Sequence, residues 1–449
     1  MPATSTRTIR IGCGMGFAGD RIDPSVELAE RGGLDFLFFE GLAERTLAAS
    51  HGARSRDPRA GFNPMFRRRM EAVLPGCRAA GTRIITNMGA ANPAGAGEAM
   101  AALARDGGFQ GLRIAVVEGD DVTAALDPGL IAMETGKPLS AVSRRMIAAN
   151  AYLGGDVIAE ALAEGADVVI TGRTADPSLV VGPLAHAFGW RFDDWPMLAA
   201  GTLVGHLLEC SAQITGGYFA DPGVKDVPDV AYVGYPLAEV TAAGDAVITK
   251  LDRTGGCVTA LTCKEQLIYE VHDPAAYKTP DVVADFSRAT IDEIAPDRVR
   301  VGGARGLQRP DQLKVTVGFD GGLLAEAEIS YAGPGAAARA RLATAIVRER
   351  MTNLHRCTEE IRFDLIGLRA LHGTALPATG ESSDVRVRAA MRTDDRRIAE
   401  TLLWEVEALW VAGPAGGGGV RGHITPSVTT QSVLIDRALV TPRITMLTA

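Results

Sequence analysis

The sequence has little of what binding to nucleic acid or to a membrane requires. Its 46 Lys and Arg residues are outnumbered by 54 Asp and Glu, which gives a formal net charge of −8 and no general excess of basic charge for a polyanion. Aromatic residues make up only 5%, too few for base-stacking platforms. No stretch approaches the roughly 18 uninterrupted apolar residues of a membrane span, and the N-terminus lacks the apolar core of a signal peptide. We therefore expect a cytoplasmic protein that binds a small molecule, with no nucleic-acid or membrane partner.

Several common cofactor and nucleophile motifs are also missing. The six cysteines form no CxxC pair, so they are expected to be reduced thiols that pack as small hydrophobic groups. There is no GxxxxGK[ST] phosphate loop and no GxSxG nucleophile motif. A GxGxxG pattern occurs at residues 14–19, but residues 20–23 separate it from the next predicted helix, whose N-terminus would have to face a pyrophosphate. We predict no nicotinamide or flavin and no other cofactor, with a divalent metal as the open alternative.

The pattern of apolar runs predicts an α/β protein with two domains. The chain of 449 residues is 47% apolar and 22% charged, as in ordinary globular proteins. In the first half, short apolar runs without alternation are separated by helical stretches, which is typical of a doubly wound, mostly parallel sheet. The predicted strands there are residues 8–11, 34–39, 83–86, 113–117 and 167–171.

The second half mixes strands and helices in another order. The letters FDGG at residues 319–322 indicate a hairpin turn between two strands, and helices are predicted at 336–351 and 396–410. This order is typical of an α+β domain. Prolines and aspartates cluster near residues 223–228, so we expect a parallel-sheet domain over 1–225 with the cleft and an α+β domain over 226–449 that contributes to the interface.

Polar residues follow every predicted strand of the first half. Because ligands bind at the carboxyl ends of the strands in open α/β sheets, these residues predict one cleft. Arg173 is a natural carboxylate partner, and Asn87 and Asn92 can orient a carbonyl oxygen. The candidate substrate-binding residues are Asp20, Glu40, Asn87, Asn92, Glu118, Asp120, Arg173 and Asp176. The acids Glu118, Asp120, Asp121 and Asp176 also suit a divalent cation.

The segment GHLLECSAQITGG at 205–217 has the highest density of reactive side chains. His206 and Glu209 share one face of a helix, and Cys210 borders the same side. These three residues are the predicted catalytic group, with Glu209 or Cys210 moving a proton and His206 as the partner. The alternative is a buried helix whose polar residues only hydrogen-bond to neighbours. A metal site would need more ligands than a single HxxE supplies.

Two TGG sequences offer backbone amides to an acidic group. The first follows the candidate catalytic residues and supplies Thr215 and Gly216, and the second supplies Thr254, Gly255 and Gly256. We count these five residues as candidate substrate-binding positions. Packing at an interface between domains is the alternative explanation for the second sequence.

Several of these motifs, taken in order, resemble those of a known family. GFAGDR (16–21), TNMGAANP (86–93), VITGRTADPSL (169–179), GHLLECSAQITGG (205–217) and TGGCVTALTCKEQLIYE (254–270) are similar to the signatures of the acyclic terpene utilisation proteins, of the AtuA-like, N-terminal-domain type. The resemblance covers nearly the whole chain. It implies a role in bacterial catabolism of citronellol and geraniol, whose intermediates are branched acyl-CoA thioesters with a second carboxylate. It supplies no agreed catalytic residue.

Residues and resemblance together lead to three hypotheses. The first is a lyase or hydro-lyase that acts on a branched carboxylated or hydroxylated acyl compound, as its acyl-CoA thioester. The second is a non-catalytic binding or assembly subunit for an acyl-CoA enzyme. The third is a metal-dependent hydrolase. We expect a homo-oligomer in each case.

Overall fold

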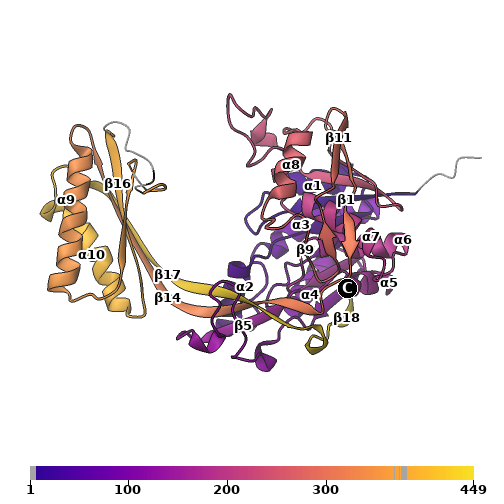
Figure 1. The fold of residues 1–449 in the computed structure, drawn as a ribbon, viewed down its shortest axis with the longest axis horizontal. Helices are drawn as coiled ribbons and strands as arrows, with labels where there is room; N and C mark the ends of the chain where they lie inside the picture. Colours follow the sequence, from indigo (N-terminus) through magenta and orange to yellow (C-terminus); the bar gives the residue numbers. More distant parts are fainter. Residues whose placement is uncertain (1–6, 369, 374, 376–381) are drawn as a thin grey trace, which may run out of the picture. The chain divides into compact units, whose positions relative to one another are not determined.

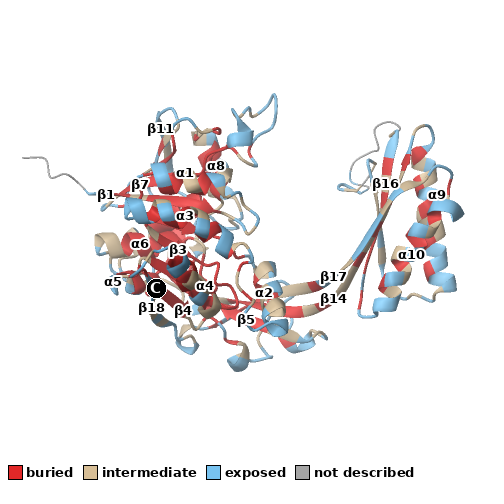
Figure 2. Ribbon diagram, turned by 180° about the vertical axis from the view of Figure 1, so that it is seen from behind, coloured by how far each residue is buried: buried red, intermediate tan, exposed pale blue. Residues whose placement is uncertain are grey.

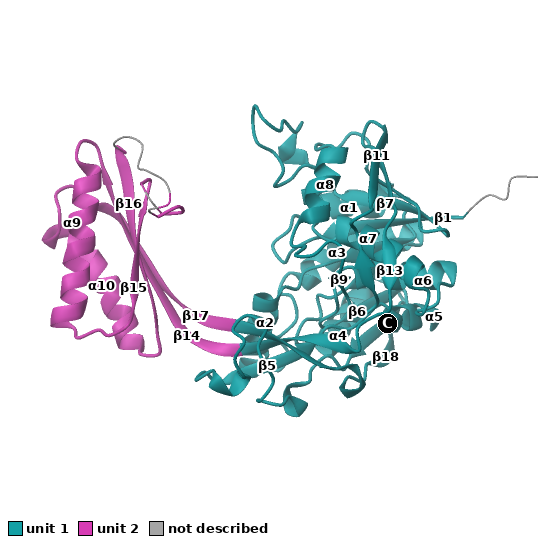
Figure 3. Ribbon diagram, viewed as in Figure 1, with its two compact units in different colours: residues 1–318, 430–449 teal, residues 319–429 magenta. Residues whose placement is uncertain are grey.

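A computed structural model describes residues 7–368, 370–373, 375 and 382–449. The chain forms two compact units, one of residues 1–318 and 430–449 and the other of residues 319–429 (Figure 3). This division differs from the expected boundary at 225/226, because strands from residues 236–302 pair with the sheet built by the first half. Only residues 319–429 form a separate α+β unit. Among the described residues, no helix has the length and apolar character needed to cross a membrane.

A sheet of ten strands forms the centre of the first unit (Figure 1). Its five middle strands are parallel and correspond to the five predicted from apolar runs. In sheet order they are β1 (Thr8–Met15), β2 (Phe36–Phe39), β3 (Arg83–Thr86), β6 (Val168–Thr171) and β4 (Arg113–Glu118).

Antiparallel strands extend this sheet on both sides. Beyond β1 lie, in sheet order, β7 (Pro236–Thr241), β8 (Ala246–Lys250), β12 (Arg298–Gly302) and β11 (Thr290–Ala295). Beyond β4 lies β18 (Arg443–Thr448), which brings the end of the chain back to the sheet. The sheet is therefore mixed, and the expected parallel arrangement holds only for its middle.

Both faces of the parallel strands are buried, which explains their continuous apolar runs (Figure 2). In β2, Phe36 and Phe38 belong to one core cluster and Leu37 and Phe39 to the other. The first cluster includes residues of α5 (Asp156–Ala163), α6 (Ser178–Phe188) and α7 (Trp195–Leu208). The second includes residues of α1 (Asp23–Arg31), α3 (Phe66–Ala80) and α4 (Pro93–Asp106).

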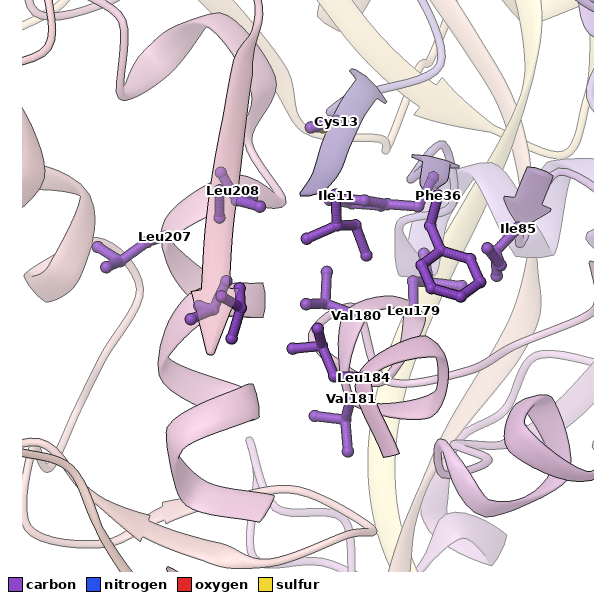
Figure 4. Close-up of a cluster of buried hydrophobic side chains, with 14 of the residues drawn as sticks. Ile11, Cys13, Phe36, Ile85, Leu179, Val180, Val181, Leu184, Leu207 and Leu208 are labelled. Atoms are coloured by element: carbon purple, nitrogen blue, oxygen red, sulfur yellow. The ribbon is translucent and has the colours of Figure 1, made fainter. Parts of the chain in front are cut away.

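Figure 4 shows the first cluster, where Ile11 and Phe36 lie beside Leu179, Val180 and Leu184 of α6. The expected α/β class is thus confirmed as a mixed α/β fold. Ten α-helices lie in the described part of the chain.

Three shorter segments complete the part of the first unit that surrounds the site. The helix α2 (Glu44–Arg56) follows β2, and β5 (Met146–Ala151) pairs with the long strand β14 (Gln312–Ala332). The helix α8 (Ala260–Ile268) packs against α7.

A small sheet packs on α7. Its order is β13 (Arg305–Leu307), β10 (Val283–Asp285) and β9 (Tyr277–Lys278). A Cβ atom at Gly306 would lie 1.8 Å from the carbonyl oxygen of Trp195, so the backbone of β13 is in direct contact with the backbone of α7.

The second unit has the order β14, α9 (Ala336–Glu349), β15 (Ile361–Ile366), β16 (Asp384–Thr393), α10 (Arg396–Ala412) and β17 (Gly418–Asp436). Its strands lie in the order β15-β16-β14-β17, with β16 antiparallel to both neighbours. This βαββαβ arrangement is ferredoxin-like. One face of the sheet packs on both helices, and the other carries ion pairs such as those of Arg388 with Glu326 and Asp364.

The hairpin expected at residues 319–322 is wrong, because β14 continues through them as one strand. Gly321 instead permits a close contact with β17, since a Cβ atom there would lie 2.8 Å from the carbonyl carbon of Ser427. Glycine inside a strand marks such close approaches as often as turns.

We predict that Gly306→Ala destabilises the first unit, because the new methyl group has no space against the fixed carbonyl of Trp195. Overpacking of this kind costs ~1–3 kcal/mol or more. The matched control is Gly418→Ala in β17, where a Cβ atom meets nothing within 4 Å. Chemical denaturation should give a clear loss for the first variant and a change within ~1 kcal/mol for the control. Equal stability of the two variants would contradict the described packing of β13 on α7.

Candidate functional site

A cavity of about 1060 Å³ lies in the first unit at the carboxyl ends of β1, β2 and β6. Its wall contains Gly16 after β1, Glu40 after β2 and Arg173 after β6, together with residues from the end of α7. This is the edge of the sheet at which open α/β proteins bind ligands. All three predicted catalytic residues, His206, Glu209 and Cys210, line it.

His206 and Glu209 form a hydrogen-bonded pair at the end of α7. The Nδ1 atom of His206 lies 2.8 Å from Oε1 of Glu209, and its Nε2 lies 3.0 Å from the carbonyl oxygen of Leu267. A carbonyl oxygen can only accept, so Nε2 bears a proton and Nδ1 faces the carboxyl group. The imidazole also stacks on Phe286, with centroids 5.8 Å apart, and contacts Tyr277 at 5.1 Å, which fixes its orientation.

The two oxygens of Glu209 have different surroundings. Oε2 is buried and has no hydrogen-bond partner in the described part of the chain. Burial raises the pKa of Glu209 to about 7, against the opposing effect of His206. Burial alone would lower the pKa of His206, but the charge and hydrogen bond of Glu209 raise it. The pair therefore shares one proton and can accept or release one near neutral pH.

Glu40 is a second carboxyl group whose proton is held unusually tightly. Its Oε1 accepts hydrogen bonds from the backbone N–H of Leu42 (2.7 Å) and from Nδ2 of Asn87 (3.1 Å). Asn87 is itself fixed, because its Oδ1 accepts from the N–H of Gly41 at 2.9 Å. Burial and the nearby charge of Asp176 raise the pKa of Glu40 to about 8. Glu40 is therefore mostly protonated at neutral pH.

Arg173 is a buried cation whose side chain is held by the protein. Its Nη1 donates to the carbonyl of Leu42 and its Nη2 donates to Oδ1 of Asp176 at 3.1 Å. The guanidinium lies 4.1 Å from the ring centroid of Tyr152. In the described structure its Nε has no hydrogen-bond partner. Burial raises the pKa of Asp176 in spite of this ion pair.

Asp120 positions the backbone that leads to Arg173. Its Oδ2 accepts from the N–H of Arg173 at 2.8 Å and from Nδ2 of Asn150 at 2.9 Å. Asn150 in turn contacts His51 at 2.8 Å. Burial raises the pKa of Asp120 to about 6. Asp120 therefore acts behind the wall of the cavity.

Glu44, four residues after Glu40, has the opposite electrostatic environment. It accepts hydrogen bonds from the hydroxyl of Tyr152 (2.6 Å) and from Nζ of Lys314 (3.1 Å). Burial would raise its pKa, but these two donors together with Arg173 lower it to about 2. Glu44 is thus ionised throughout the neutral range.

The glycine pattern at 14–19 serves a close contact within the chain. A Cβ atom at Gly16 would lie 2.4 Å from the carbonyl carbon of Cys210 and 2.6 Å from the backbone nitrogen of Ser211. On the other side, the N–H of Glu40 donates to the carbonyl of Met15 at 2.9 Å. Glu40 and Glu209 therefore flank the same point of the chain. Asp20 closes the loop by accepting from the N–H of Gly16 at 2.8 Å.

The other predicted residues lie away from the cavity. Asn92 caps α4 by accepting from the N–H of Gly95 at 3.0 Å, and Glu118 ends β4 opposite Arg443. The two TGG sequences pack against each other, since a Cβ atom at Gly256 would lie 2.3 Å from the carbonyl oxygen of Thr215.

The predicted residues thus fall into three groups. Those in the cavity wall are Glu40, Arg173, Asp176, His206, Glu209 and Cys210. Those hydrogen-bonded behind it are Asp20, Asn87 and Asp120. Those outside it are Asn92, Glu118, Thr215, Gly216, Thr254, Gly255 and Gly256.

Cys210 lines the cavity as a thiol. Burial raises its pKa above the ordinary value, and the charge of Glu209 raises it further. Because the thiolate is the reactive form, this environment suits Glu209 better than Cys210 for chemistry at neutral pH.

Several residues of the wall were not singled out from the sequence. They are Glu44, Tyr152, Tyr269, Glu270, Tyr277, Lys278 and Lys314. Tyr269 and Glu270 end the motif TGGCVTALTCKEQLIYE, so the family resemblance contained a signal for them. Lys314 comes from β14, whose pairing with β5 no local pattern indicates.

No three His, Cys, Asp or Glu side chains come together in a metal-binding arrangement among the described residues. Of the acids considered for a cation, Asp120 is bonded to Asn150 and to the backbone of Arg173, and Asp121 accepts from the N–H of Thr123 at 3.0 Å.

The model of the acyclic terpene utilisation family protein AtuA matches residues 9–446. The chain belongs to this family. Its membership supports a role in acyclic terpene utilisation.

Comparisons with individual proteins add little. No curated protein matches the chain. Among solved structures, the de novo designed protein Foldit4 is 16% identical and covers 23% of this chain and 94% of its own, with a TM-score of 0.17. The de novo designed protein Ferredog-Diesel is 18% identical and covers 23% and 85%, with a TM-score of 0.16.

The pKa of Glu40 predicts a pH-dependent stability. Its folded-state pKa of about 8 lies above the ordinary 4.5, so the folded protein binds the proton more tightly than the unfolded chain. Wild type therefore loses stability relative to Glu40→Gln as the pH rises from about 5 to about 8, by on the order of 4 kcal/mol at most. Guanidinium denaturation of both proteins at the two pH values measures the effect.

Glu44→Gln is the matched control for this measurement. The pKa of Glu44 is lowered to about 2, so its contribution is lost only as the pH falls below about 4.5. Its stability difference from wild type should be the same at pH 5 and pH 8. A constant difference for Glu40→Gln as well would show that Glu40 titrates normally.

Proposed function

We propose that the chain is a lyase or hydro-lyase that removes a proton from the carbon beside the carbonyl of a branched acyl compound, supplied as an acyl-CoA thioester. Membership of the acyclic terpene utilisation family supports the metabolic role. The observation that supports the chemistry is the His206–Glu209 pair, in which Glu209 lines the cavity and its buried Oε2 has no partner among the described residues.

Glu209 is the base in this proposal. Its pKa of about 7 leaves an appreciable fraction ionised at neutral pH and makes it a stronger base than an ordinary glutamate. The carbonyl of Leu267 holds the proton of His206 on Nε2, so Nδ1 stays directed at Glu209. Glu209 raises the pKa of His206, and as an imidazolium His206 donates from Nδ1 to Oε1 and so stabilises and orients the carboxylate before the proton arrives.

The substrate carbonyl is placed by the cationic part of the wall. Asn87 already bonds to Glu40 and Gly41, and Asn92 caps α4, so neither is available to a substrate. Arg173 is the buried cation that lines the cavity, and a developing negative charge on the carbonyl oxygen gains from a cation in a dry site. A cavity of about 1060 Å³ accommodates a branched acyl chain with part of its thioester carrier.

A non-catalytic assembly subunit is the second candidate. Trp404 and Trp410 of α10 are each 61% exposed and Val411 is 95% exposed. Exposed apolar side chains on one helix are typical of surfaces that bind another protein. If partner binding is the main function, Trp404→Ala should abolish co-purification with a partner protein. In that case neither wild type nor Trp404→Ala should catalyse the exchange of α-protons.

We predict that Glu209→Gln lowers the rate of exchange between the substrate's α-proton and D₂O by ~10²–10⁴-fold, because the base is lost. Mass spectrometry of a branched acyl-CoA in D₂O measures the exchange. Glu160→Gln, an exposed change on α5, is the control and should exchange at the wild-type rate. The melting temperature of Glu209→Gln should stay close to that of wild type.

The packing alternative predicts the reverse. A glutamate that only supports α7 would cost ~1–3 kcal/mol of stability on substitution, with the activity of each folded molecule retained. Retained exchange in Glu209→Gln would therefore refute the catalytic role.

A further inference from the structure

Two carboxyl groups that line the cavity belong to segments in contact with residues 15 and 16. Glu209 follows α7 and packs, through its backbone, against Gly16, while Glu40 follows β2 and bonds to Met15. Each group has one oxygen fixed by the protein, to His206 in one case and to Asn87 and Leu42 in the other. Among the described residues, the hydrogen bonds that Glu40 accepts reach Oε1. Each carboxyl group thus keeps a second oxygen for a ligand.

The charge of the wall distinguishes between classes of substrate. Six acids line the cavity, namely Glu40, Glu44, Asp176, Glu209, Glu270 and Asp311. The three cations of the wall are Arg173, Lys278 and Lys314. Arg173 is paired with Asp176 and Lys314 with Glu44. Because these two cations are already paired, a second carboxylate on the substrate would gain little from them, whereas a neutral hydroxyl needs no cation.

We infer that this site removes water from a β-hydroxyacyl compound, with Glu209 taking the α-proton and Glu40 donating a proton to the departing hydroxyl. The inference rests on the proposed function and narrows it to a hydro-lyase. It also selects the hydroxylated substrate over the dicarboxylic one.

The step balances without any further reactant. The C–H bond next to the carbonyl breaks and its proton goes to Oε2 of Glu209, while the electron pair forms the C=C bond. The C–O bond of the β-hydroxyl breaks, and this oxygen takes the proton of Glu40 and leaves as water. Glu209 ends protonated and Glu40 ionised, and one proton returned from Glu209 to Glu40 restores both.

The resting protonation states agree with these roles. Burial and Asp176 raise the pKa of Glu40 to about 8, so it holds a proton to donate at neutral pH. Glu209 faces His206 through Oε1, and its pKa of about 7 leaves a fraction ionised that supplies the base. Two carboxyl groups in different surroundings commonly divide acid and base roles in this way.

The test uses two readouts on one probe, 3-hydroxy-3-methylbutanoyl-CoA. Exchange of its α-protons in D₂O reports the base, and formation of the conjugated double bond, followed by ultraviolet absorbance, reports loss of water. In Glu40→Gln we expect dehydration to fall by ~10²–10⁴-fold while exchange stays within a few-fold of wild type. In Glu209→Gln both should fall, and in the control Glu160→Gln neither should change.

Three other results would each overturn a specific claim. If Glu40→Gln dehydrates the probe as fast as wild type, the inference is overturned and the proposed function stands. If wild type exchanges the α-protons of 3-methylglutaryl-CoA, a dicarboxylic probe, but neither exchanges nor dehydrates the hydroxylated one, the hydroxyl specificity is overturned alone. If wild type exchanges no proton on either probe, the proposed function itself fails.

Discussion

The backbone after β1 lies against the backbone at the end of α7 so closely that no side chain fits between them. A Cβ atom at Gly16 would lie 2.4 Å from the carbonyl carbon of Cys210. Because Glu40 is hydrogen-bonded to Met15 on the adjacent strand, this one contact brings Glu40 and Glu209 to the same part of the cavity. Through this contact, the arrangement of β1, β2 and α7 determines where Glu40 and Glu209 lie in the site.

Burial then gives the two carboxyl groups their chemistry. A glutamate in water is ionised at neutral pH and is a weak base, but desolvation raises the pKa of Glu209 to about 7 and that of Glu40 to about 8. The pKa of a buried carboxyl group also depends on the groups that bond to it. In Glu44, Tyr152 and Lys314 lower the pKa to about 2 in spite of burial. The cavity therefore contains carboxyl groups with different charges within a few residues of one another.

The sequence predicted the parts of the fold that depend on local patterns. Apolar runs without alternation indicated β1 and β2 because both faces of these strands are buried. The HxxE spacing indicated that His206 and Glu209 share a helical face, and the two are hydrogen-bonded. Their catalytic role remains a prediction.

Local sequence patterns could not predict the pairing of strands that lie far apart in the chain. The antiparallel strands β7 and β8 look like any other β-rich segments, so their addition to the sheet, and with it the position of the domain boundary, could not be foreseen. Asn87 and Asn92 occur in one motif, yet one supports Glu40 and the other caps α4, a difference set by the turn between them. Glycines were ambiguous for the same reason, since Gly321 in FDGG and Gly16 both serve close backbone contacts.

The central claim is that Glu40 and Glu209 are a pair of carboxyl groups with raised pKa values at one site. The most direct measurement is a pH titration of the protein by NMR with ¹³C-labelled glutamate carboxyl groups, using Glu40→Gln and Glu209→Gln to assign the signals. We expect the two signals to titrate with midpoints near pH 8 and pH 7. Midpoints below about pH 5 for both, as in exposed glutamates, would contradict it.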